Sequence, residues 1–362
     1  MYIIAHNGSA ILGGGEISTA RLLAGMQDRG HRVLMLFRDR TIADRAAEFG
    51  IPVDVQLIGG DVMVQDAVRF GLRMKAERPD ALILTTFKKI FLAGSGARMA
   101  QVPRVVQRIV LAGDTPARGR RYRFAVSHLV DEVLVNAGSL LSPFREELPP
   151  SAREKVEVVA DGVTAPARTE PSGALRRRLG IPADCPVIGT VTRLARQKRL
   201  ERLIGALAVM ESDTHCIVAG EGSELGQLEA LCRSAGVMSR VHFVGFEKNI
   251  GDVLDALDLF VISSEREGMA NSMLEAMAFG IPVISTLVSG AEEALLGISG
   301  DTPPGMVVSH TAEAIAAAAQ PLLKNVAQRK AMGEAGQARI RNVFSFERMV
   351  DRWEEHLQNA KA

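Results

Sequence analysis

Two carboxylates stand close together in EREGMANSMLEAMAF, residues 265–279, with seven residues between Glu267 and Glu275. We expect Glu267 in the loop after a strand over 258–264, and Glu275 within the helix that follows. A carboxylate accepts paired hydrogen bonds from neighbouring hydroxyls, so each suits a sugar or a ribose. The alternative is that they cap and solvate a helix. An acid near a helix N-terminus is stabilising, which fits Glu267 but explains Glu275 poorly.

Two cations follow another expected strand in TRLARQKRLERL, residues 192–203. Arg193 stands where the strand ends, and Lys198 lies five residues later, near the start of a helix. At the carboxyl ends of parallel strands such a pair can converge on one diphosphate. Charged residues are also common on solvated helix surfaces, and we assign Arg196 and Arg199 to that class.

A glycine-rich stretch, ILGGGEIS, residues 11–18, joins the first expected strand to the first helix. N–H groups at a helix N-terminus attract an anion, and glycines let the backbone approach a phosphate without a Cβ in the way. Gly13, Gly15 and Ser18 match the dinucleotide fingerprint GxGxxG only in part, with Asp39 in the place of its ribose acid. A flexible strand-to-helix turn is the alternative.

The elements that must position these residues are short apolar runs alternating with helical patterns, which indicates parallel, doubly wound sheets. A proline-containing segment, 161–186, separates two such series. The expected strands cover 2–6, 32–37, 81–87, 104–110 and 132–137 before it, and 187–194, 215–222, 240–246, 258–264 and 281–287 after it.

The fold class is therefore α/β, with two Rossmann-like domains whose parallel sheets face a cleft. We expect an N-terminal, acceptor-binding domain over 1–165 and a C-terminal, donor-binding domain over 166–343. The last helix, within 344–362, is expected to pack back toward the N-terminal domain.

Composition narrows the function classes. The 362 residues are 47% hydrophobic, enough for two cores, and a net charge of +1 with 4% aromatic residues argues against nucleic acid as a partner. Cys185, Cys216 and Cys232 show no CxxC pair and no metal-ligand spacing, which fits a reducing compartment. Without a signal-peptide pattern or an apolar run of about 18 residues, we expect a cytoplasmic protein, with peripheral membrane association left open.

Taken in order, these segments resemble the retaining glycosyltransferases with the GT-B fold, specifically family 4 (glycosyltransferase group 1). The spacing of Glu267 and Glu275 matches the E-x7-E signature of that family. Further matching segments follow the family's order: GGGE, DGV, VTRLARQK, CIVAGEGSE, VHFVGF and DLFVISSEREG. The resemblance covers most of the chain, firmly over residues 155–300 and loosely in the N-terminal half.

The resemblance implies a nucleotide-sugar donor, more often a UDP-sugar than a GDP-sugar, and assigns residues to it. Glu275 would bind the ribose, Arg193 and Lys198 the diphosphate, and Glu267 the donated sugar. The other assigned positions are Gly268, Met269 and Ala270 beside the sugar and phosphate, Gly14 and Gly15 beside the diphosphate, and Phe246, Glu247 and Asn249 around the base.

The implied reaction retains the anomeric configuration by front-face attack, with the leaving phosphate accepting the acceptor's proton. Arg193, Lys198 and the glycine-loop amides would stabilise charge on the leaving phosphates, and Glu267 completes the expected catalytic set. No DxD-type metal motif stands beside them, so we expect a reaction that needs neither a metal nor a cofactor.

The acceptor side departs from the family. Many members carry a histidine after the middle strands of the N-terminal domain, where this chain has RVVQRIVLAGDTP. We expect His6, Lys88 and Asp114 to line this side instead. Asp161 and Thr192 stand where the family often has asparagine and glycine, changes that remove no key functional group.

The expected acceptor is a saccharide, a lipid-linked saccharide or another glycoconjugate. The segment PARGRRYRFAV, residues 116–126, combines four arginines with Tyr122 and Phe124. It suits a phosphorylated saccharide or anionic lipid headgroups, and a solvated basic loop is the alternative.

Two other function classes stay open. A GT-B-like nucleotide-sugar epimerase or hydrolase would use the same donor residues without a sugar acceptor, and a non-catalytic nucleotide-sugar-binding protein would only hold the donor. An NAD-dependent dehydrogenase is disfavoured, because the cations and carboxylates of the second half would then have no role.

Overall fold

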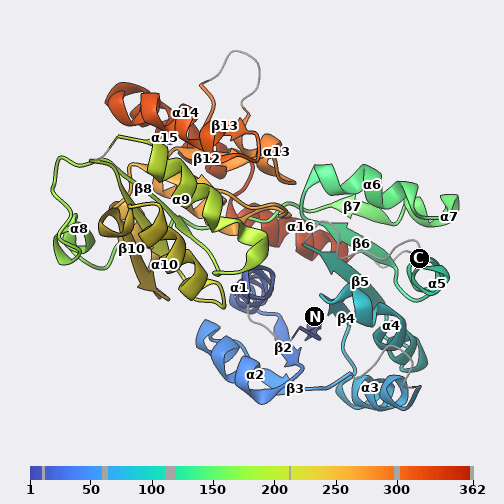
Figure 1. The fold of residues 1–362 in the computed structure, drawn as a ribbon. Helices are drawn as coiled ribbons and strands as arrows, with labels where there is room; N and C mark the ends of the chain where they lie inside the picture. The colour runs from blue at the N-terminus through green and yellow to red at the C-terminus, as the bar shows by residue number, and fades with distance from the viewer. Residues whose placement is uncertain (10–12, 59–63, 111–118, 212, 297–301, 359–362) are drawn as a thin grey trace. The chain divides into compact units, whose positions relative to one another are not determined.

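The computed structural model describes residues 1–362 except 10–12, 59–63, 111–118, 212, 297–301 and 359–362. It divides the chain into two compact units. Unit 1 consists of Met1–Asp161 together with Phe346–Ala362, and unit 2 of Gly162–Ser345. The chain leaves unit 1 after Asp161 and returns to it at Phe346, so unit 1 combines two segments that are far apart in sequence (Figure 1).

Unit 1 is built on a seven-stranded parallel sheet in the order β3-β2-β1-β4-β5-β6-β7. Its longer strands are buried almost throughout, as expected where helices cover both faces of a sheet. The strands are β1 (Tyr2–Asn7), β2 (Arg32–Phe37), β3 (Val53–Val55), β4 (Ala81–Leu84), β5 (Arg104–Ile109), β6 (Glu132–Val135) and β7 (Val156–Val158).

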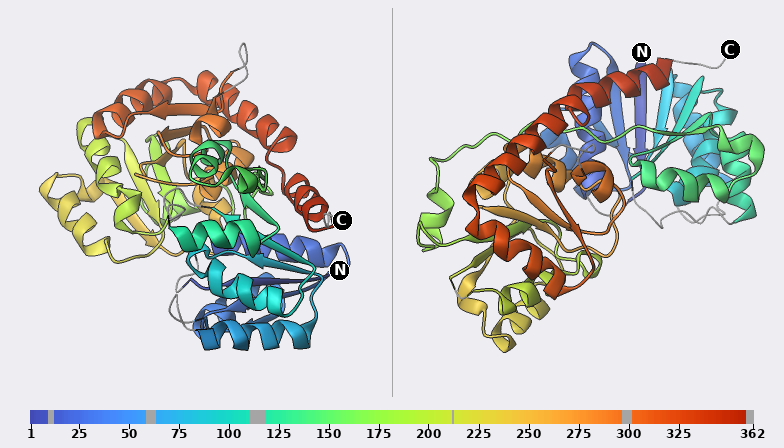
Figure 2. Two further views of the ribbon diagram at one scale, coloured as in Figure 1. Left: turned by 90° about the vertical axis from the view of Figure 1, so that its right-hand side faces the viewer. Right: turned by 90° about the horizontal axis from the view of Figure 1, so that it is seen from above.

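Two helices from the two segments of unit 1 share one face of this sheet. Helices α1 (Gly14–Asp28) and α16 (Phe346–Gln358) pack together and form a core with alternate strand residues such as Ile3 and Val106 (Figure 2). The opposite face carries α3, whose Phe70 meets the His6 ring edge-on. The remaining helices are α2 (Arg40–Ala46), α3 (Val64–Glu77), α4 (Ile90–Met99), α5 (Arg120–His128), α6 (Leu141–Glu146) and α7 (Pro150–Arg153), with 3-10 turns η1 (Ala47–Phe49), η2 (Phe87–Lys89) and η3 (Gly138–Leu140).

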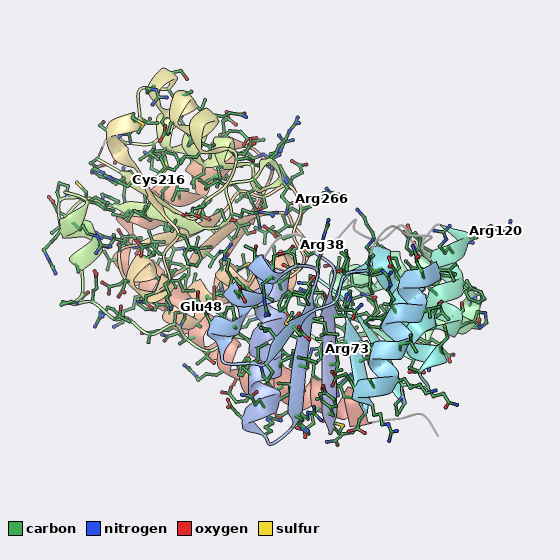
Figure 3. The ribbon with its side chains drawn as sticks, turned by 90° about the horizontal axis from the view of Figure 1, so that it is seen from below. Arg38, Glu48, Arg73, Arg120, Cys216 and Arg266 are labelled. Atoms are coloured by element: carbon green, nitrogen blue, oxygen red, sulfur yellow. The ribbon has the colours of Figure 1, made fainter. Side chains whose placement is uncertain are left out.

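Unit 2 repeats the plan with a six-stranded parallel sheet in the order β10-β9-β8-β11-β12-β13. Residues of α9, α10 and α14 form a core with alternate strand residues such as Ile188 and Val261. Cys216 lies in this core (Figure 3), and all three cysteines are free thiols. The strands are β8 (Val187–Val191), β9 (His215–Ala219), β10 (Val241–Gly245), β11 (Leu259–Ile262), β12 (Val283–Thr286) and β13 (Gly305–Val308).

The helices of unit 2 include α12, which packs on α15 because Gly280 and Gly333 let the two backbones approach. A Cβ on Gly333 would lie 2.1 Å from the Gly280 carbonyl oxygen. The helices are α8 (Ala174–Arg178), α9 (Leu200–Val209), α10 (Leu225–Ser234), α11 (Ile250–Asp255), α12 (Asn271–Phe279), α13 (Ala291–Leu295), α14 (Ala312–Lys324) and α15 (Val326–Asn342), with 3-10 turns η4 (Arg196–Lys198) and η5 (Met238–Arg240).

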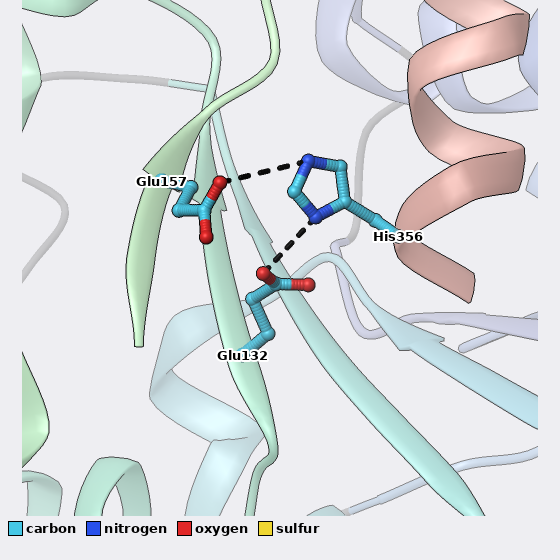
Figure 4. Close-up of side chains that lie close together, drawn as sticks. All are labelled: Glu132, Glu157 and His356. Carbon is cyan, nitrogen blue, oxygen red and sulfur yellow. Dashed lines mark hydrogen bonds and ion pairs between the residues drawn. The ribbon is translucent and has the colours of Figure 1, made fainter. Parts of the chain in front are cut away.

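Buried charges tie α16 to the sheet of unit 1. Arg104 on β5 donates from Nε to the His356 carbonyl oxygen (2.9 Å) and from Nη2 to Glu132 (2.6 Å). His356 donates from Nδ1 to Glu132 Oε1 (3.0 Å), and its Nε2 lies 3.9 Å from Glu157 Oε2 (Figure 4). Such a set of ligand groups can hold a metal ion, but Arg104 and Arg352 place positive charge against it. We interpret the cluster as an ion-pair network that anchors the helix.

The two sheets confirm the expected α/β class, while several element boundaries differ from the expectation. The strand expected over 81–87 ends at Leu84, because the chain turns at Thr85 and Thr86 into η2. Strands β3, β7 and β13 are missed by the sequence pattern because they are short and partly exposed, and so form no continuous apolar run as the equally short but fully buried β4, β6, β11 and β12 do. Among the described residues, no helix has the length and apolar character that crossing a bilayer requires.

Candidate functional site

The strand order of unit 2 determines where its loops meet. The chain begins at β8 in the middle of the sheet, moves outward to β9 and β10, and then crosses to the other side with β11. In open parallel sheets, ligands bind beyond the carboxyl ends of the strands at such a reversal. Arg193 and Lys198 follow β8, and Glu267 follows β11, so three of the expected site residues lie in the two loops at this point.

Lys198 and Glu267 form an ion pair there, between Nζ and Oε1. Ser264 donates from Oγ to the same carboxylate oxygen (2.7 Å). Glu267 is only 8% exposed, so its charge depends on these partners rather than on water. The helix-capping alternative is wrong for Glu267, because α12 begins at Asn271 with Ala270 as an N-cap that no side chain bonds.

The loops that carry Lys198 and Glu267 are joined to each other. The Glu265 N–H donates to the Gln197 carbonyl oxygen (2.9 Å), and Ser263 Oγ donates to the Lys198 carbonyl oxygen (2.9 Å). Arg199 adopts left-handed backbone (φ 51°, ψ 43°), which is rare for a non-glycine residue, and its Nε donates to Glu265 (3.2 Å). Arg199 is a surface charge, as expected, with its side chain 37% exposed, and it also bonds Glu265 beside the turn that carries Lys198.

Arg193 is positioned by its backbone. The N–H groups of its neighbours Thr192 and Leu194 donate to carbonyl oxygens of residues 219 and 221, in the loop after β9 (2.9 and 2.8 Å). That loop contains Gly222, where a Cβ would lie only 2.1 Å from the Leu194 carbonyl oxygen. The Arg193 side chain is exposed, and within the described part of the chain its guanidinium has no hydrogen bond or ion pair.

The start of α12 adjoins this pair of loops. Met269 and Ala270 are buried just before the helix, and Gly290 packs beneath them, since a Cβ there would lie 3.1 Å from Met269 Sδ and 3.2 Å from the Gly268 carbonyl oxygen. The dipole and first-turn N–H groups of a helix start favour an anion. Glu275 lies in the second turn and is buried, which is uncommon for a helical glutamate. Its role in ribose binding stays a prediction.

The residues expected around the base follow β10, at the edge of the sheet. Phe246 is 61% exposed, so its ring is available for stacking. Glu247 lies 3.8 Å from Arg178, and Asn249 donates from Nδ2 to Thr169 Oγ1 (3.2 Å). These two side chains therefore contact the segment that leads into unit 2, and Phe246 is the best placed of the three for a base.

In unit 1 the strand order reverses between β1 and β4. Gly14 and Gly15 open α1 after β1, and Lys88 follows β4 as an exposed residue of η2. A Cβ on Gly14 would meet nothing within 4 Å, whereas one on Gly15 would lie 2.7 Å from Val110 Cγ2. A side chain is therefore tolerated at Gly14 but not at Gly15, where glycine is needed for packing α1 against Val110.

The other expected acceptor-side residues differ in accessibility. His6 is 1% exposed and donates from Nε2 to the Gln56 carbonyl oxygen (3.1 Å). Burial lowers the pKa of His6 to about 4, so the ring is neutral at pH 7. This enclosed position makes His6 a packing residue in the structure rather than an accessible one. Asp114 lies outside the described residues.

Residues 172–339 match the family model described as Glycosyl transferases group 1. The chain is also similar to the lipopolysaccharide core biosynthesis glycosyltransferase LpsE of Rhizobium meliloti, with 32% identity over 49% of this chain and 51% of the relative. It is 30% identical to N-acetyl-alpha-D-glucosaminyl L-malate synthase of Bacillus anthracis over 50% of this chain and 47% of the relative. The chain thus spans about half the length of the curated relatives it matches.

Two solved structures share the fold over the whole chain. The crystal structure of Anabaena Alr3699/HepE in complex with UDP matches with a TM-score of 0.85 and 20% identity, over 99% of both chains. A glycosyltransferase from Rickettsia africae matches with a TM-score of 0.84 and 17% identity, again over 99% of both. At these identities the likeness shows the fold alone, two Rossmann-like units with parallel sheets.

Some supporting residues of the group 1 segment are missed from sequence alone. Ser264 completes the environment of Glu267, and its signal is a polar residue directly after an apolar strand, in DLFVISS. Gly222 supports the loop of Arg193, and its signal is the GEG that ends CIVAGEG. Both patterns are common at strand ends, so neither identifies a contact before the fold is known.

We predict that Gly222→Ala destabilises unit 2 by about 2 kcal/mol, because its Cβ overlaps the Leu194 carbonyl and forces the Arg193 loop to move. Urea unfolding followed by circular dichroism measures this. Gly226→Ala is the matched control, since a Cβ on that residue of α10 meets nothing within 4 Å and alanine favours a helix. Equal stability of the two variants would contradict the predicted overlap.

We predict that His6 makes unit 1 sensitive to acid. Its pKa in the folded chain, about 4, lies below the ordinary histidine value of 6.5, so the unfolded chain binds the proton first as the pH falls. Stability is therefore full above about pH 6.5 and is lost as the pH falls toward 4, by about 3 kcal/mol in total. His6→Gln keeps a donor for the Gln56 carbonyl, so the urea midpoint of this variant should fall less than that of the wild type between pH 6.5 and pH 4. If the urea midpoints of variant and wild type differ by the same amount at pH 7 and at pH 4, His6 is not the source of the acid sensitivity.

Proposed function

We propose that this chain is a retaining glycosyltransferase that moves a sugar from a UDP-sugar to a saccharide, lipid-linked or other glycoconjugate acceptor. The observation that carries the proposal is the buried Lys198–Glu267 pair beyond the carboxyl ends of β8 and β11. A cation and a carboxylate held side by side there match the two ends of a sugar diphosphate. The match of residues 172–339 to the glycosyl transferases group 1 supports the reaction class.

In this proposal Arg193 and Lys198 bind the donor diphosphate, and Glu267 accepts hydrogen bonds from hydroxyls of the donated sugar. The helix start at Met269 and Ala270 supports the sugar and phosphate, and Glu275 binds the ribose. Gly14 and Gly15 of unit 1 contribute backbone N–H groups to the diphosphate. Phe246 stacks on the base, with Glu247 and Asn249 beside it.

The chemistry follows from where charge develops. As the bond between the anomeric carbon and the phosphate oxygen breaks, negative charge grows on the leaving diphosphate and positive charge on the sugar ring. In this proposal Arg193, Lys198 and the glycine-loop amides stabilise the charge on the diphosphate. The acceptor hydroxyl attacks from the side of the leaving group, forms the new glycosidic bond, and passes its proton to the departing phosphate oxygen. The configuration is retained, and neither a protein base nor a metal is required.

The donor class rests on structural relatives. The Anabaena protein of the same fold has been crystallised with UDP and with UDP-glucose. Among the curated relatives, one is a GDP-mannose-dependent mannosyltransferase of Corynebacterium glutamicum, so GDP-sugars are the second donor class to test. Several relatives act in lipopolysaccharide core biosynthesis, which supports a glycan or glycolipid acceptor.

The donor site is tested by thermal unfolding with UDP, GDP, ADP and their sugar conjugates. A ligand at about a hundred times its Kd stabilises the fold by about 2.7 kcal/mol, a shift of several degrees. We expect a UDP compound to stabilise the wild type and Glu275→Gln, which keeps the side-chain volume, to lose most of the effect. Glu334→Gln, at an exposed position of α15, is the control. No shift of the wild type with any nucleotide would contradict the donor site.

The reaction class is tested by product analysis. Incubation with the stabilising donor and a set of saccharide and glycolipid acceptors, followed by NMR of the anomeric proton, reveals transfer and its stereochemistry. Products with inverted configuration would contradict the retaining mechanism. Release of free sugar or an epimerised donor without transfer would favour the epimerase or hydrolase alternative, and binding without turnover a non-catalytic protein.

We further propose that unit 1 associates peripherally with membranes that contain anionic lipids. Residues 87–128 contain nine lysines and arginines, of which Arg104 and Arg108 are buried, but one acid, Asp114. Arg120, at the outer edge of unit 1 in Figure 3, opens α5, which also exposes Arg121, Arg123 and Phe124. Helix α3, which packs on α4 next to α5, exposes Val64, Val68 and Leu72, one turn apart along one side. Basic residues beside exposed apolar ones suit an anionic bilayer surface.

We therefore predict co-sedimentation with vesicles of anionic phospholipid that weakens as salt is raised, and little binding to zwitterionic vesicles. Replacing Arg120, Arg121 and Arg123 by glutamine should remove most of the binding. The matched control replaces three exposed basic residues of unit 2, Arg233, Lys330 and Arg341, by glutamine. Equal binding of both triple variants would overturn the assignment to α5.

A further inference from the structure

Arg108 is a fully buried arginine at the carboxyl end of β5. It is 2% exposed and points, like Val106, to the face of the sheet that α1 and α16 cover. Its Nη1 donates to Thr19 Oγ1 and its Nη2 to Ser18 Oγ (2.7 Å), both on α1. Its guanidinium carbon lies 5.7 Å from the centre of the Trp353 ring of α16.

The charge of Arg108 is balanced by Asp161, the last residue before the chain enters unit 2. The Asp161 carboxylate also accepts from Ser18 Oγ (3.1 Å) and from Asn136 Nδ2 (2.7 Å). All four side chains are buried, so the network is sealed from water. The guanidinium fork fits this arrangement because its rigid, planar set of donors is spread over two nitrogens, whereas a lysine ammonium gathers its donors on one compact atom.

The network reaches the glycine loop through Thr19. This hydroxyl accepts from Arg108 and donates to the Gly15 carbonyl oxygen (2.9 Å), one turn earlier in α1. A threonine that bonds the carbonyl four residues back changes the local geometry of its helix. Because Arg108 determines which way the hydroxyl points, it also determines how the first turn of α1 is held.

Stability alone does not require such a pair. Well-packed apolar residues of similar volume usually match or exceed the stability of a buried ion pair. A buried arginine that bonds Ser18 and Thr19 of α1 and Asp161 at the end of the outgoing segment has a directional effect that apolar packing would lack. The residues it directs are the ones that open α1 at Gly14 and Gly15.

We propose that Arg108 is a positioning residue, which through Thr19 fixes the first turn of α1 so that the N–H groups of Gly14 and Gly15 are aligned for a nucleoside diphosphate. The inference rests on the proposed function for its ligand. It adds a role for Arg108, Thr19 and Asp161, none of which touches the diphosphate in this arrangement.

The test compares Thr19→Val, which keeps the shape and loses the hydroxyl, with Thr19→Ser, which keeps the hydroxyl. Arg108→Lys keeps the charge and loses the fork. Calorimetric titration with UDP should show about tenfold weaker binding for Thr19→Val and Arg108→Lys, and binding within twofold of wild type for Thr19→Ser. Uridine, which has no phosphates, should bind all four proteins equally.

Hydrogen exchange without ligand provides a second readout. The Ile17 amide, which donates to the Gly13 carbonyl oxygen (3.0 Å), should exchange faster in Thr19→Val and Arg108→Lys than in Thr19→Ser. Unchanged UDP affinity and unchanged exchange in folded Thr19→Val would overturn the proposal, as would an equal loss of UDP and uridine binding. If the wild type binds no nucleoside diphosphate, the proposed function fails, and the exchange data alone decide whether Arg108 positions the helix.

Discussion

Parallel strands are joined by crossovers that carry the chain back to the end of the sheet from which the previous strand started, and this constraint organises both units. All loops that follow a strand therefore begin at the same end of the sheet, where the strands have their carboxyl ends. Where the strand order reverses, the crossovers of two neighbouring strands run in opposite directions and leave space between their loops. In unit 2 the reversal brings the segment after β8 next to the segment after β11. In unit 1 it brings the glycine loop next to the loop of Lys88. The candidate residues follow from this geometry before any side chain is considered.

The opposite charges at the carboxyl ends of the unit 2 strands are already paired with each other. Lys198 and Glu267 neutralise each other at a largely buried position, with Ser264 as a third partner. A lone carboxylate or ammonium there would be costly. In the proposed function, an incoming sugar diphosphate exchanges the contact between the pair for contacts with its own hydroxyls and phosphates. Little reorganisation of the protein is then needed, because the loops that carry both residues are already bonded to each other.

Much of this can be read from the sequence, and the limits have physical causes. The sequence singles out Glu267, Glu275, Arg193 and Lys198, because the proposed chemistry requires particular residue types at fixed distances from strand ends. Arg108 gives no such signal, because its partners Ser18, Thr19 and Asp161 lie about 90 and 50 residues away and meet it only through packing. The left-handed turn at Arg199 is likewise invisible, because nothing in that residue type favours it.

The return of the chain to unit 1 has a consequence for its synthesis. Helix α16 completes the core of unit 1 with Met349, Val350, Trp353 and Leu357, yet it is made after the whole of unit 2. At about 5–20 residues per second, a ribosome needs on the order of 10–40 s to translate residues 162–345. During that interval all seven strands of unit 1 already exist, but the apolar face that α16 covers in the folded protein stays open. Vectorial synthesis therefore leaves the nascent N-terminal unit, with its strands complete and one helix missing, as the part that chaperones would meet.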